Sequence, residues 1–429
     1  MTTAEPGDSG HAGHGGHGGH GHEVTADMVS VDQHVADVAA LVRPLSPTDL
    51  PLTEAEGCVL AADLTAGHQL PPFDNSAMDG YAVRAADVAG ATDSDPVTLP
   101  VTGEVAAGDT GAYGITPGMC LRIMTGALMP GGADAVVPVE WTDGGTAKVA
   151  IRRPAEAGNA VRRAGGDARG GDVLLSSGTV LGPAQIGLAA TAGHGTVPVR
   201  PRPRVVVIST GNELAEPGAP VIPGKIWESN SFMLAAAARQ AGCLAYRAPI
   251  VPDDQHALLD AIEDQFLRAD VIITSGGVSM GGENDVVKDV LRRLGTVTFR
   301  KVAMQPGMPQ GFGVIGPDET PIFNLPGNPV SAYVSFQLFV RAALDAMLCT
   351  RELALPATRA KLSAPLRAPA GRRAFLRGVL NRSEGTVQPL SGQGSHQLAA
   401  LGRANALIVA PEWVVAMKEG DEADVLILP

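Results

Sequence analysis

Apolar and polar residues follow different patterns in successive parts of this chain. Residues 1–27 form a Gly/His tract that cannot bury a core, so we expect no packed structure there. Over residues 29–42 apolar residues recur at helical spacing, and Pro44 ends the predicted helix. Residues 74–161 contain short strand-like runs broken by glycine, which predict a small β-rich module.

From Arg204 onward the pattern predicts strands that alternate with helices. Residues 205–208 are a continuous apolar run, as expected of a strand buried on both faces. The alternation predicts a parallel, doubly wound α/β sheet over residues 202–349. After Pro356 the chain is strand-like and rich in turns, which suits a small β-barrel or sandwich. Further strands are expected at 245–250, 271–274, 297–302 and 322–325, and helices at 183–192, 230–240, 254–267, 285–294 and after Asn328.

Composition narrows the class of protein. With 429 residues, several domains are expected, and the net charge of −13 argues against nucleic-acid or anionic-membrane partners. The four cysteines lack CxxC spacing and are expected to be free thiols. Without a membrane span or secretion signal in the sequence, we expect a cytoplasmic protein. The histidines of the tail either bind a soft divalent metal ion or are simply solvated.

The candidate chemistry lies where strands of the predicted sheet end, since open α/β sheets bind ligands beyond their carboxyl edge. Three such ends are unusual: Ser209–Glu213, Thr274–Gly282 and Leu325–Pro329. Their glycines allow backbone N–H groups to approach phosphate closely, although Gly-rich turns are common and the fingerprints of the Walker loop and of dinucleotide-binding folds are absent.

Acidic side chains gather at the same predicted edge. Glu213, Asp253 and Asp285 each follow a strand or precede a helix, where a single acid is ordinarily a cap or a solvated residue. Together they offer the hard oxygen ligands that suit Mg²⁺ beside phosphate. A second acidic segment at 71–82 is either a turn-rich linker or a second group of functional acids. An arginine cluster at 152–169 either faces solvent or attracts an anionic substrate.

Taken together, the segments resemble the MoeA family of molybdopterin molybdenumtransferases, which includes the gephyrin E-domain. The matching words are PPFDNSAMDGYAVR, RIMTGA, ADAVVPVE, STGNEL, TSGGVS, LPGNPVSA and GSHQLAALGRANALIV, and they run from about residue 28 to the C-terminus. The resemblance implies an elongated linker domain, a β-rich insertion domain, a MogA-like α/β domain and a C-terminal β-barrel. The tail corresponds to residues 1–27, and the linker domain to 28–74 and 164–201. The insertion domain corresponds to 75–163, the α/β domain to 202–349 and the β-barrel to 350–429.

The resemblance also implies a homodimer whose active sites are completed across the subunit interface. Asp79 and Thr125 match residues that reach the site from the partner subunit. Glu213 and Asp285 match acids linked to Mg²⁺, and Asp253 matches a further active-site carboxylate.

Other matches surround the ligand. The pterin- and nucleotide-binding loop corresponds to Gly276, Gly277 and Ser279, and Lys301 matches a basic residue near the pterin phosphate or molybdate. Residues of the last strand end match the edge of the pocket: Pro326, Gly327, Asn328 and Pro329.

This chain departs from the family pattern in two places. Many relatives carry two lysines in a KPGKP-like segment, whereas Gln305 and Met308 stand here. The loop after Ser279 is one residue longer than in the relatives, so the acid that matches the metal ligand is either Asp285 or Glu283.

The function implied is insertion of molybdenum from molybdate into adenylylated molybdopterin, with release of AMP and formation of the molybdenum cofactor. The alternatives are a molybdopterin-binding scaffold without catalysis and a MogA-type adenylyltransferase. Tungstate in place of molybdate is a third alternative, which the sequence does not decide.

Overall fold

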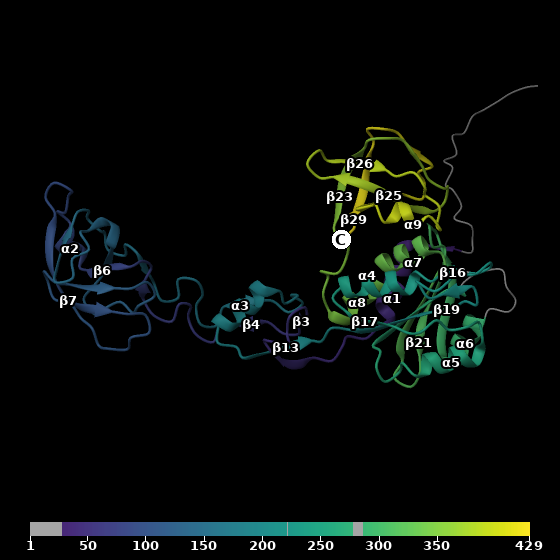
Figure 1. Cartoon of the computed structure of the whole chain (residues 1–429), viewed down its shortest axis with the longest axis horizontal. Coiled ribbons are helices and arrows are strands. Elements are labelled where there is room, and N and C mark those ends of the chain that lie inside the picture. The colour runs from purple at the N-terminus through teal and green to yellow at the C-terminus, as the bar shows by residue number, and fades with distance from the viewer. Residues whose placement is uncertain (1–27, 221, 278–285) are drawn as a thin grey trace, which may run out of the picture. The chain divides into compact units, whose positions relative to one another are not determined.

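The computed structural model describes residues 28–220, 222–277 and 286–429, which form two compact units (Figure 1). One unit consists of the residues up to Pro44, Pro203–Met347 and Leu353–Pro429. The other consists of Leu45–Arg202 and Leu348–Glu352.

The first unit is built on a mixed seven-stranded sheet, in the order β1-β19-β21-β22-β18-β14-β17. Strands β14, β17, β18 and β22 are parallel, as predicted, whereas β21 runs antiparallel to both of its neighbours. The expectation of a wholly parallel sheet was therefore wrong at this strand. Only residues 303–308 connect β19 to β21, which is too short for a crossover and suffices for an antiparallel return. The strands are β1 (Met28–Val29), β14 (Arg204–Ser209), β17 (Leu244–Arg247), β18 (Val271–Ser275), β19 (Gly295–Val302), β21 (Pro309–Ile315) and β22 (Thr320–Leu325).

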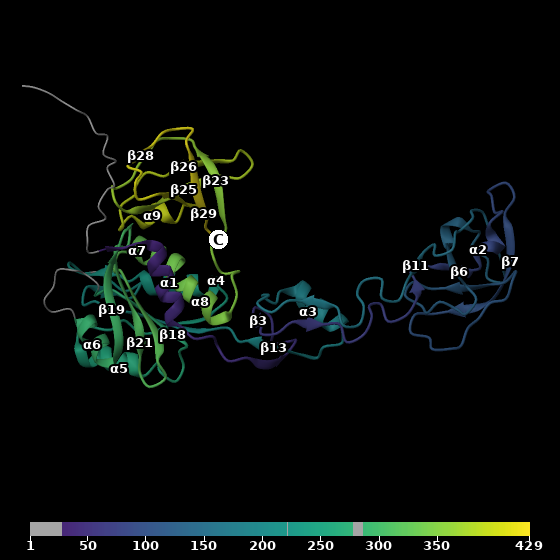
Figure 2. The same ribbon diagram turned by 180° about the vertical axis from the view of Figure 1, so that it is seen from behind.

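Helices cover both faces of this sheet, as in a doubly wound fold (Figures 1 and 2). Helices α5 and α6 pack on one face over a core that includes Val206, Ile208 and Ile272. Helix α5 begins as predicted, because the Asp254 side chain accepts a hydrogen bond from the Ala257 N–H. The helices are α1 (Val31–Leu41), α4 (Asn230–Gln240), α5 (Gln255–Glu263), α6 (Val286–Leu294), α7 (Pro329–Ser335), the π-helix η2 (Phe336–Val340) and α8 (Arg341–Leu348).

The first described residues belong to this sheet. Strand β1 pairs with β19, so that Met28 lies opposite Lys301, and α1 packs against β21 and η2. We had grouped residues 28–74 with the linker domain, whereas the structure packs 28–44 with the α/β sheet. The α1 face that carries the buried Val31, His34 and Val38 explains this placement. The other domain boundaries stay predictions.

A closed β-barrel follows the α/β sheet in the same unit. Strands β25, β26, β23, β29 and β27 pair in that order, and β27 returns to β25. The short β20 (Met304–Gln305) joins the edge at β25. The barrel strands are β23 (Ala357–Leu362), β25 (Arg373–Asn381), β26 (Thr386–Pro389), β27 (Ala406–Ala410) and β29 (Glu422–Ile427), accompanied by β24 (Leu366–Arg367), β28 (Ala416–Met417) and α9 (Leu398–Leu401).

The second unit contains the predicted β-rich module, a five-stranded sheet in the order β10-β7-β8-β6-β9. Its strands are β6 (Gly80–Val83), β7 (Val97–Val105), β8 (Cys120–Ile123), β9 (Ala135–Pro138) and β10 (Lys148–Ile151), with α2 (Ala85–Val88) and the 3₁₀ turn η1 (Val139–Trp141). Small sheets and α3 make up the remainder: β2 (Thr48–Pro51), β3 (Val59–Leu60), β4 (Leu64–Thr65), β5 (Asn75–Ser76), β11 (Val161–Arg162), β12 (Val173–Leu175), β13 (Thr196–Arg200) and α3 (Pro183–Thr191).

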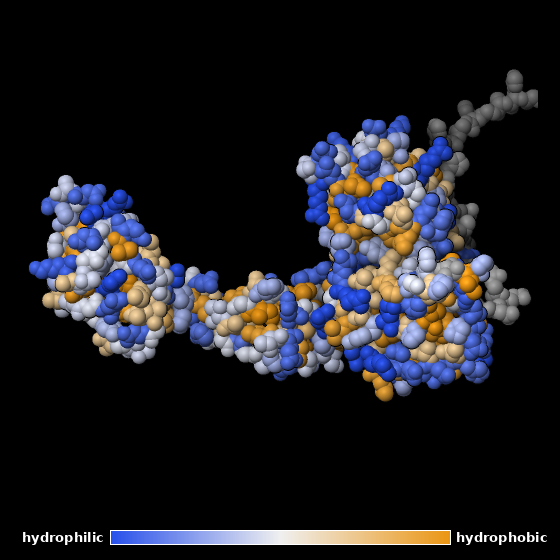
Figure 3. Space-filling model, in the orientation of Figure 1, coloured by the Kyte–Doolittle hydropathy of each residue, from blue (hydrophilic) through white to orange (hydrophobic). Residues whose placement is uncertain are grey.

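Two further expectations concern the whole chain. All four cysteines are free thiols, as predicted, and three of them are buried. In the described residues no helix is long and apolar enough to cross a membrane. Both polar and apolar residues are exposed on the face of each unit drawn in Figure 3.

Candidate functional site

A cavity of about 290 Å³ opens at the carboxyl edge of the seven-stranded sheet. It lies where β14, β18 and β22 end, as the sequence predicted. The strand ends contribute Ser209, Thr210, Glu213, Ser275, Gly276, Gly327, Asn328 and Pro329. The other lining residues are Leu214 of β15 (Leu214–Ala215), Ile226 and Trp227 of β16 (Ile226–Trp227), Glu228, Ser229, Asn230 and His396.

Asn230 holds two of the strand ends together. Its Nδ2 donates hydrogen bonds to Ser275 Oγ at 2.6 Å and to the Gly327 carbonyl at 2.7 Å. Ser229 is the N-cap residue of α4, but its side chain makes no capping hydrogen bond. The Asn230 side chain instead fixes the loops after β18 and β22, a long-range role that no local pattern signals.

The glycine at the end of β18 is required by space as well as by backbone conformation. Gly276 has a φ of +110°, and a Cβ there would lie 3.1 Å from the Thr210 carbonyl oxygen. A hydrogen bond from Asn324 Nδ2 to the Gly276 carbonyl, 3.0 Å long, fixes the turn. The backbone is therefore exposed to the cavity without a side chain in front of it, as a phosphate-binding loop needs.

Glu213 and Asp253 were predicted to lie at the carboxyl edge of the sheet. Only Glu213 lines the cavity. Asp253 is tied to the residue beside Glu213, because its Oδ2 accepts from the Asn212 N–H at 3.1 Å and its own N–H donates to Asn212 Oδ1 at 3.2 Å.

A third acid, which the sequence reasoning missed, is buried in the wall of the cavity. Glu228 is 2% exposed and accepts hydrogen bonds from Ser209 Oγ at 2.8 Å, and from the Ser231 N–H at 2.8 Å and Oγ at 2.6 Å. Arg247 lies 3.7 Å from its carboxylate. Its position just before a helix start was the available signal, since acids favour helix N-termini.

The barrel also contributes to the cavity, through His396. The loop before it is fixed by Arg377, whose Nη2 donates to the carbonyls of Gly392 at 2.6 Å and Gly394 at 3.1 Å. Arg377 is fully buried, and its Nε and Nη1 have no hydrogen-bond partner among the residues described. Burial lowers the pKa of this guanidinium. His396 lies in the segment GSHQLAALGRANALIV that matched the family, but no sequence pattern around it indicated that this barrel loop reaches the edge of the sheet.

Several predicted residues do not line the cavity. Gly277 follows Gly276 with a φ of +64°, Pro326 is buried, and Lys301 lies at the end of β19. Gln305, where the resemblance implied a lysine, lies in β20 beside the barrel. The predicted Ser279, Glu283 and Asp285 lie outside the described residues.

Asp79 and Thr125 form one group in the second unit. Asp79 Oδ1 accepts hydrogen bonds from the Thr125 N–H at 2.7 Å and from its Oγ1 at 2.8 Å. The bond from the Thr125 backbone is the main reason that the pKa of Asp79 lies below its usual value. Met78 and Met124 beside them are each 41% exposed. The structure thus brings these two predicted residues together, as an exposed anionic group between apolar side chains.

Comparison with known proteins matches this architecture segment by segment. Three family models cover the chain: the MoeA N-terminal region (domain I and II) at residues 29–193, a probable molybdopterin binding domain at 206–346, and the MoeA C-terminal region (domain IV) at 359–428. Molybdopterin molybdenumtransferase 2 of Mycobacterium tuberculosis is 48% identical over 405 residues, covering 93% of this chain and 99% of the relative. The chain belongs to the MoeA family.

Other MoeA proteins agree with this assignment. Molybdopterin molybdenumtransferase of Bacillus subtilis is 33% identical over 93% of this chain and 94% of its own length. Two crystal structures of the molybdopterin biosynthesis MoeA protein from Pyrococcus horikoshii, 32% and 28% identical, have TM-scores of 0.76 and 0.77. Each covers 93% of this chain and at least 99% of its own. The resemblance and the fold class predicted from sequence are confirmed.

Proposed function

We propose that this protein inserts molybdenum from molybdate into adenylylated molybdopterin, releasing AMP and forming the molybdenum cofactor. The observation that carries the proposal is the cavity at the carboxyl edge of the molybdopterin-binding domain. Gly276 and Gly327 present backbone there, and Asn230 holds both loops in place. Such a site suits the phosphates of an adenylylated pterin.

The reaction cleaves the phosphoanhydride between the pterin phosphate and AMP. Glu213 would face the phosphates, and Asp253, oriented by Asn212, would position the attacking oxygen. His396 offers a polar group from the barrel side. Molybdate is an anionic substrate, so donors fixed before it arrives would stabilise it without reorganisation.

Magnesium fits the kind of side chain found at this edge. Glu213, Ser209 and Thr210 offer oxygen ligands, which Mg²⁺ prefers. Among the described residues no group of three acidic, histidine or cysteine side chains could hold a metal ion alone. Glu213 would hold the ion together with substrate phosphates and with Asp285 or Glu283. Bound Mg²⁺ would neutralise phosphate charge as the leaving group departs.

We further propose a cytoplasmic homodimer in which Asp79 and Thr125 act in the partner's cavity. Support comes from the exposed Asp79–Thr125 pair beside Met78 and Met124, because polar groups next to exposed apolar side chains are available to a partner subunit.

The test is to mix purified protein with adenylylated molybdopterin, Mg²⁺ and molybdate, and to quantify AMP and active cofactor. We expect AMP release that depends on molybdate. Glu213→Ala should abolish it while pterin binding remains largely intact, and AMP release at the normal rate in this variant would disprove the role of Glu213.

Other outcomes would favour the alternatives. Tight pterin binding without AMP release would indicate a scaffold, and Gln305→Lys with Met308→Lys would then be the first substitutions to test. Adenylylation of free pterin by ATP would indicate an adenylyltransferase. Competing tungstate against molybdate would settle which oxyanion is preferred.

A further inference from the structure

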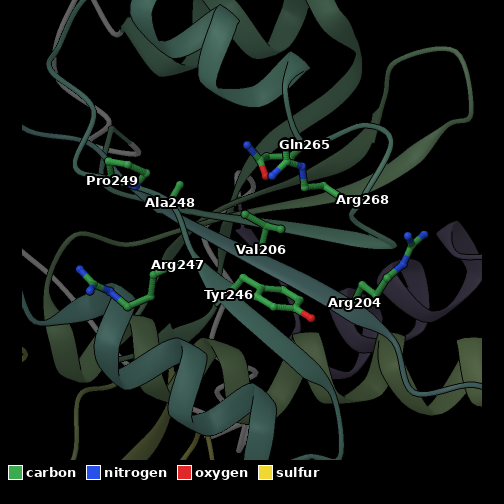
Figure 4. Close-up of a pocket in the computed structure, with 8 residues that line it drawn as sticks. All are labelled: Arg204, Val206, Tyr246, Arg247, Ala248, Pro249, Gln265 and Arg268. Atoms are coloured by element: carbon green, nitrogen blue, oxygen red, sulfur yellow. The ribbon is translucent and has the colours of Figure 1, made fainter.

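A second cavity, of about 460 Å³, lies beside the edge strand β17 and shares no lining residue with the carboxyl-edge cavity (Figure 4). Its volume is within the range of small-molecule sites, which is roughly 300–1,000 Å³. We propose that this cavity, called the β17 cavity below, binds a small planar aromatic anion. The proposal is independent of the function proposed above.

The β17 cavity lies on the face of the sheet that α5 covers, where Val206 of β14 is covered and Tyr246 of the edge strand β17 is not. The register places Val206 of β14 opposite Tyr246 of β17, so both side chains lie on the same face of the sheet. Val206 is buried in the core beneath α5, together with Leu258 and Ile262. Tyr246, one strand further out, remains 56% exposed. A trough is left between its ring and the chain segment that follows α5.

The walls of the trough suit a flat ligand. In Figure 4 the side chains of Gln265 and Arg268 lie together on one side, and the Tyr246 ring lies on the other, with Val206 between them. Ala248 completes the apolar part of the lining. A planar ring can stack on the tyrosine and on the guanidinium plane, because aromatic and guanidinium groups both pack face to face with π-systems.

The charge of the lining selects an anion. The three charged residues that line the β17 cavity are all arginines, in a chain whose net charge is −13. Arg204 is neutralised by Asp270, with Nη2 and Oδ1 2.8 Å apart. Arg247 points away from the cavity and its guanidinium lies 3.3 Å from the centre of the Phe232 ring.

Arg268 is the remaining cation. In the part of the chain that the structure describes, its guanidinium has neither an ion pair nor a side-chain hydrogen bond. A carboxylate or similar group on the ligand can therefore bind it without displacing an internal acid, and such charge-assisted bonds are the stronger ones.

The experiment uses 2-naphthoate as the probe, with the full chain and fluorescence anisotropy as the readout. We expect saturable binding with one site per chain, and at least tenfold weaker binding of the neutral 2-naphthamide, as loss of a charged hydrogen bond implies about a tenfold change or more. Arg268→Gln should weaken 2-naphthoate binding about tenfold, and Tyr246→Ala about fivefold through lost stacking. Arg382→Gln, at an exposed arginine in the barrel, is the matched control and should change nothing.

A further variant separates the two cavities. Ala248→Trp places an indole in the β17 cavity and should abolish probe binding, while AMP release in the molybdenum-insertion assay stays at the level of the unmodified protein. Circular dichroism verifies that each variant is folded. The proposal is overturned if 2-naphthoate does not saturate, if the Arg268 and control variants bind alike, or if folded Ala248→Trp binds as before.

Discussion

His34 makes the stability of the α/β unit depend on pH, and His34→Gln should remove that dependence. The imidazole is 1% exposed, and its ring packs edge-on against Phe312 and Phe339, with centroids 5.0 and 4.3 Å apart. Its Nδ1 accepts from Arg300 Nε at 3.0 Å and lies 2.7 Å from Nη2. Burial, and then the charge of Arg300, lower the pKa of His34 from 6.5 to about 3, against the opposing effect of Asp37.

The sign of the effect follows from which state binds the proton. The unfolded chain protonates His34 near its ordinary pKa of 6.5, whereas the folded unit keeps it neutral down to about pH 3. Stability is therefore complete at neutral pH and is lost as the pH falls through this window. At 1.36 kcal/mol for each pKa unit, the loss is about 2 kcal/mol at about pH 5 and about 3 kcal/mol at about pH 4.

The assay is urea unfolding of a Trp141→Phe background, followed by fluorescence. The two remaining tryptophans, Trp227 and Trp413, both belong to the unit that contains His34. Between about pH 7 and about pH 5, His34→Gln should lose about 2 kcal/mol less than the background protein. The exposed His256 is the matched control, and His256→Gln should keep the full pH dependence. Equal losses in the background and the His34 variant, or an NMR titration of His34 near 6.5, would refute the reasoning.

Three other predictions concern the site. Mixing Asp79→Ala with Glu213→Ala subunits in equal amounts should restore AMP release to about a quarter of that of the unmodified protein. Half of randomly assembled dimers are mixed, and each mixed dimer regains one of its two sites. No recovery after verified subunit exchange would argue against shared sites. Gly276→Ala should lower the free energy of unfolding by about 1–3 kcal/mol and abolish AMP release, because its Cβ would press on the Thr210 carbonyl at a positive φ. Urea unfolding would measure the first effect and the AMP assay the second. Removal of Mg²⁺ with a chelator should stop AMP release and its return should restore it, whereas release in the presence of the chelator would contradict the metal role of Glu213.

Local patterns predicted most of the α/β unit. The apolar run at 205–208 and the start of the predicted helix at 254 were both placed correctly, because burial on two faces and helix capping are encoded by adjacent residues, whereas α5 ends at Glu263 and not at 267. Strand β21 was missed: its sequence PQGFGVI is short and rich in glycine, and its pairing with β19 and β22 is a property of the sheet. Helix α1 was predicted, but its place on the sheet depends on partners such as Arg300.

The site divides in the same way. Glu213, Gly276 and residues 327–329 could be found because open α/β sheets bind ligands at the ends of their strands. Asn230 and His396 could not, since the amide acts on loops 45 and 97 residues away and the imidazole arrives from another domain. Sequence words identified the family, but they did not show which of their residues face the cavity.

The barrel is a wall of the carboxyl-edge cavity and not only a C-terminal attachment. The Val330 N–H, in the first turn of α7, donates to the Ser395 carbonyl at 3.1 Å, so the barrel loop is bonded to the helix that follows Gly327. Arg377 fixes the same loop from inside the barrel through two carbonyls. A guanidinium buried without an acid is costly, and the two carbonyls of this loop are the hydrogen-bond acceptors that offset part of that cost. The position of His396 is thereby set from both the barrel and α7, so a change inside the barrel core can displace a side chain that lines the cavity at the edge of the sheet.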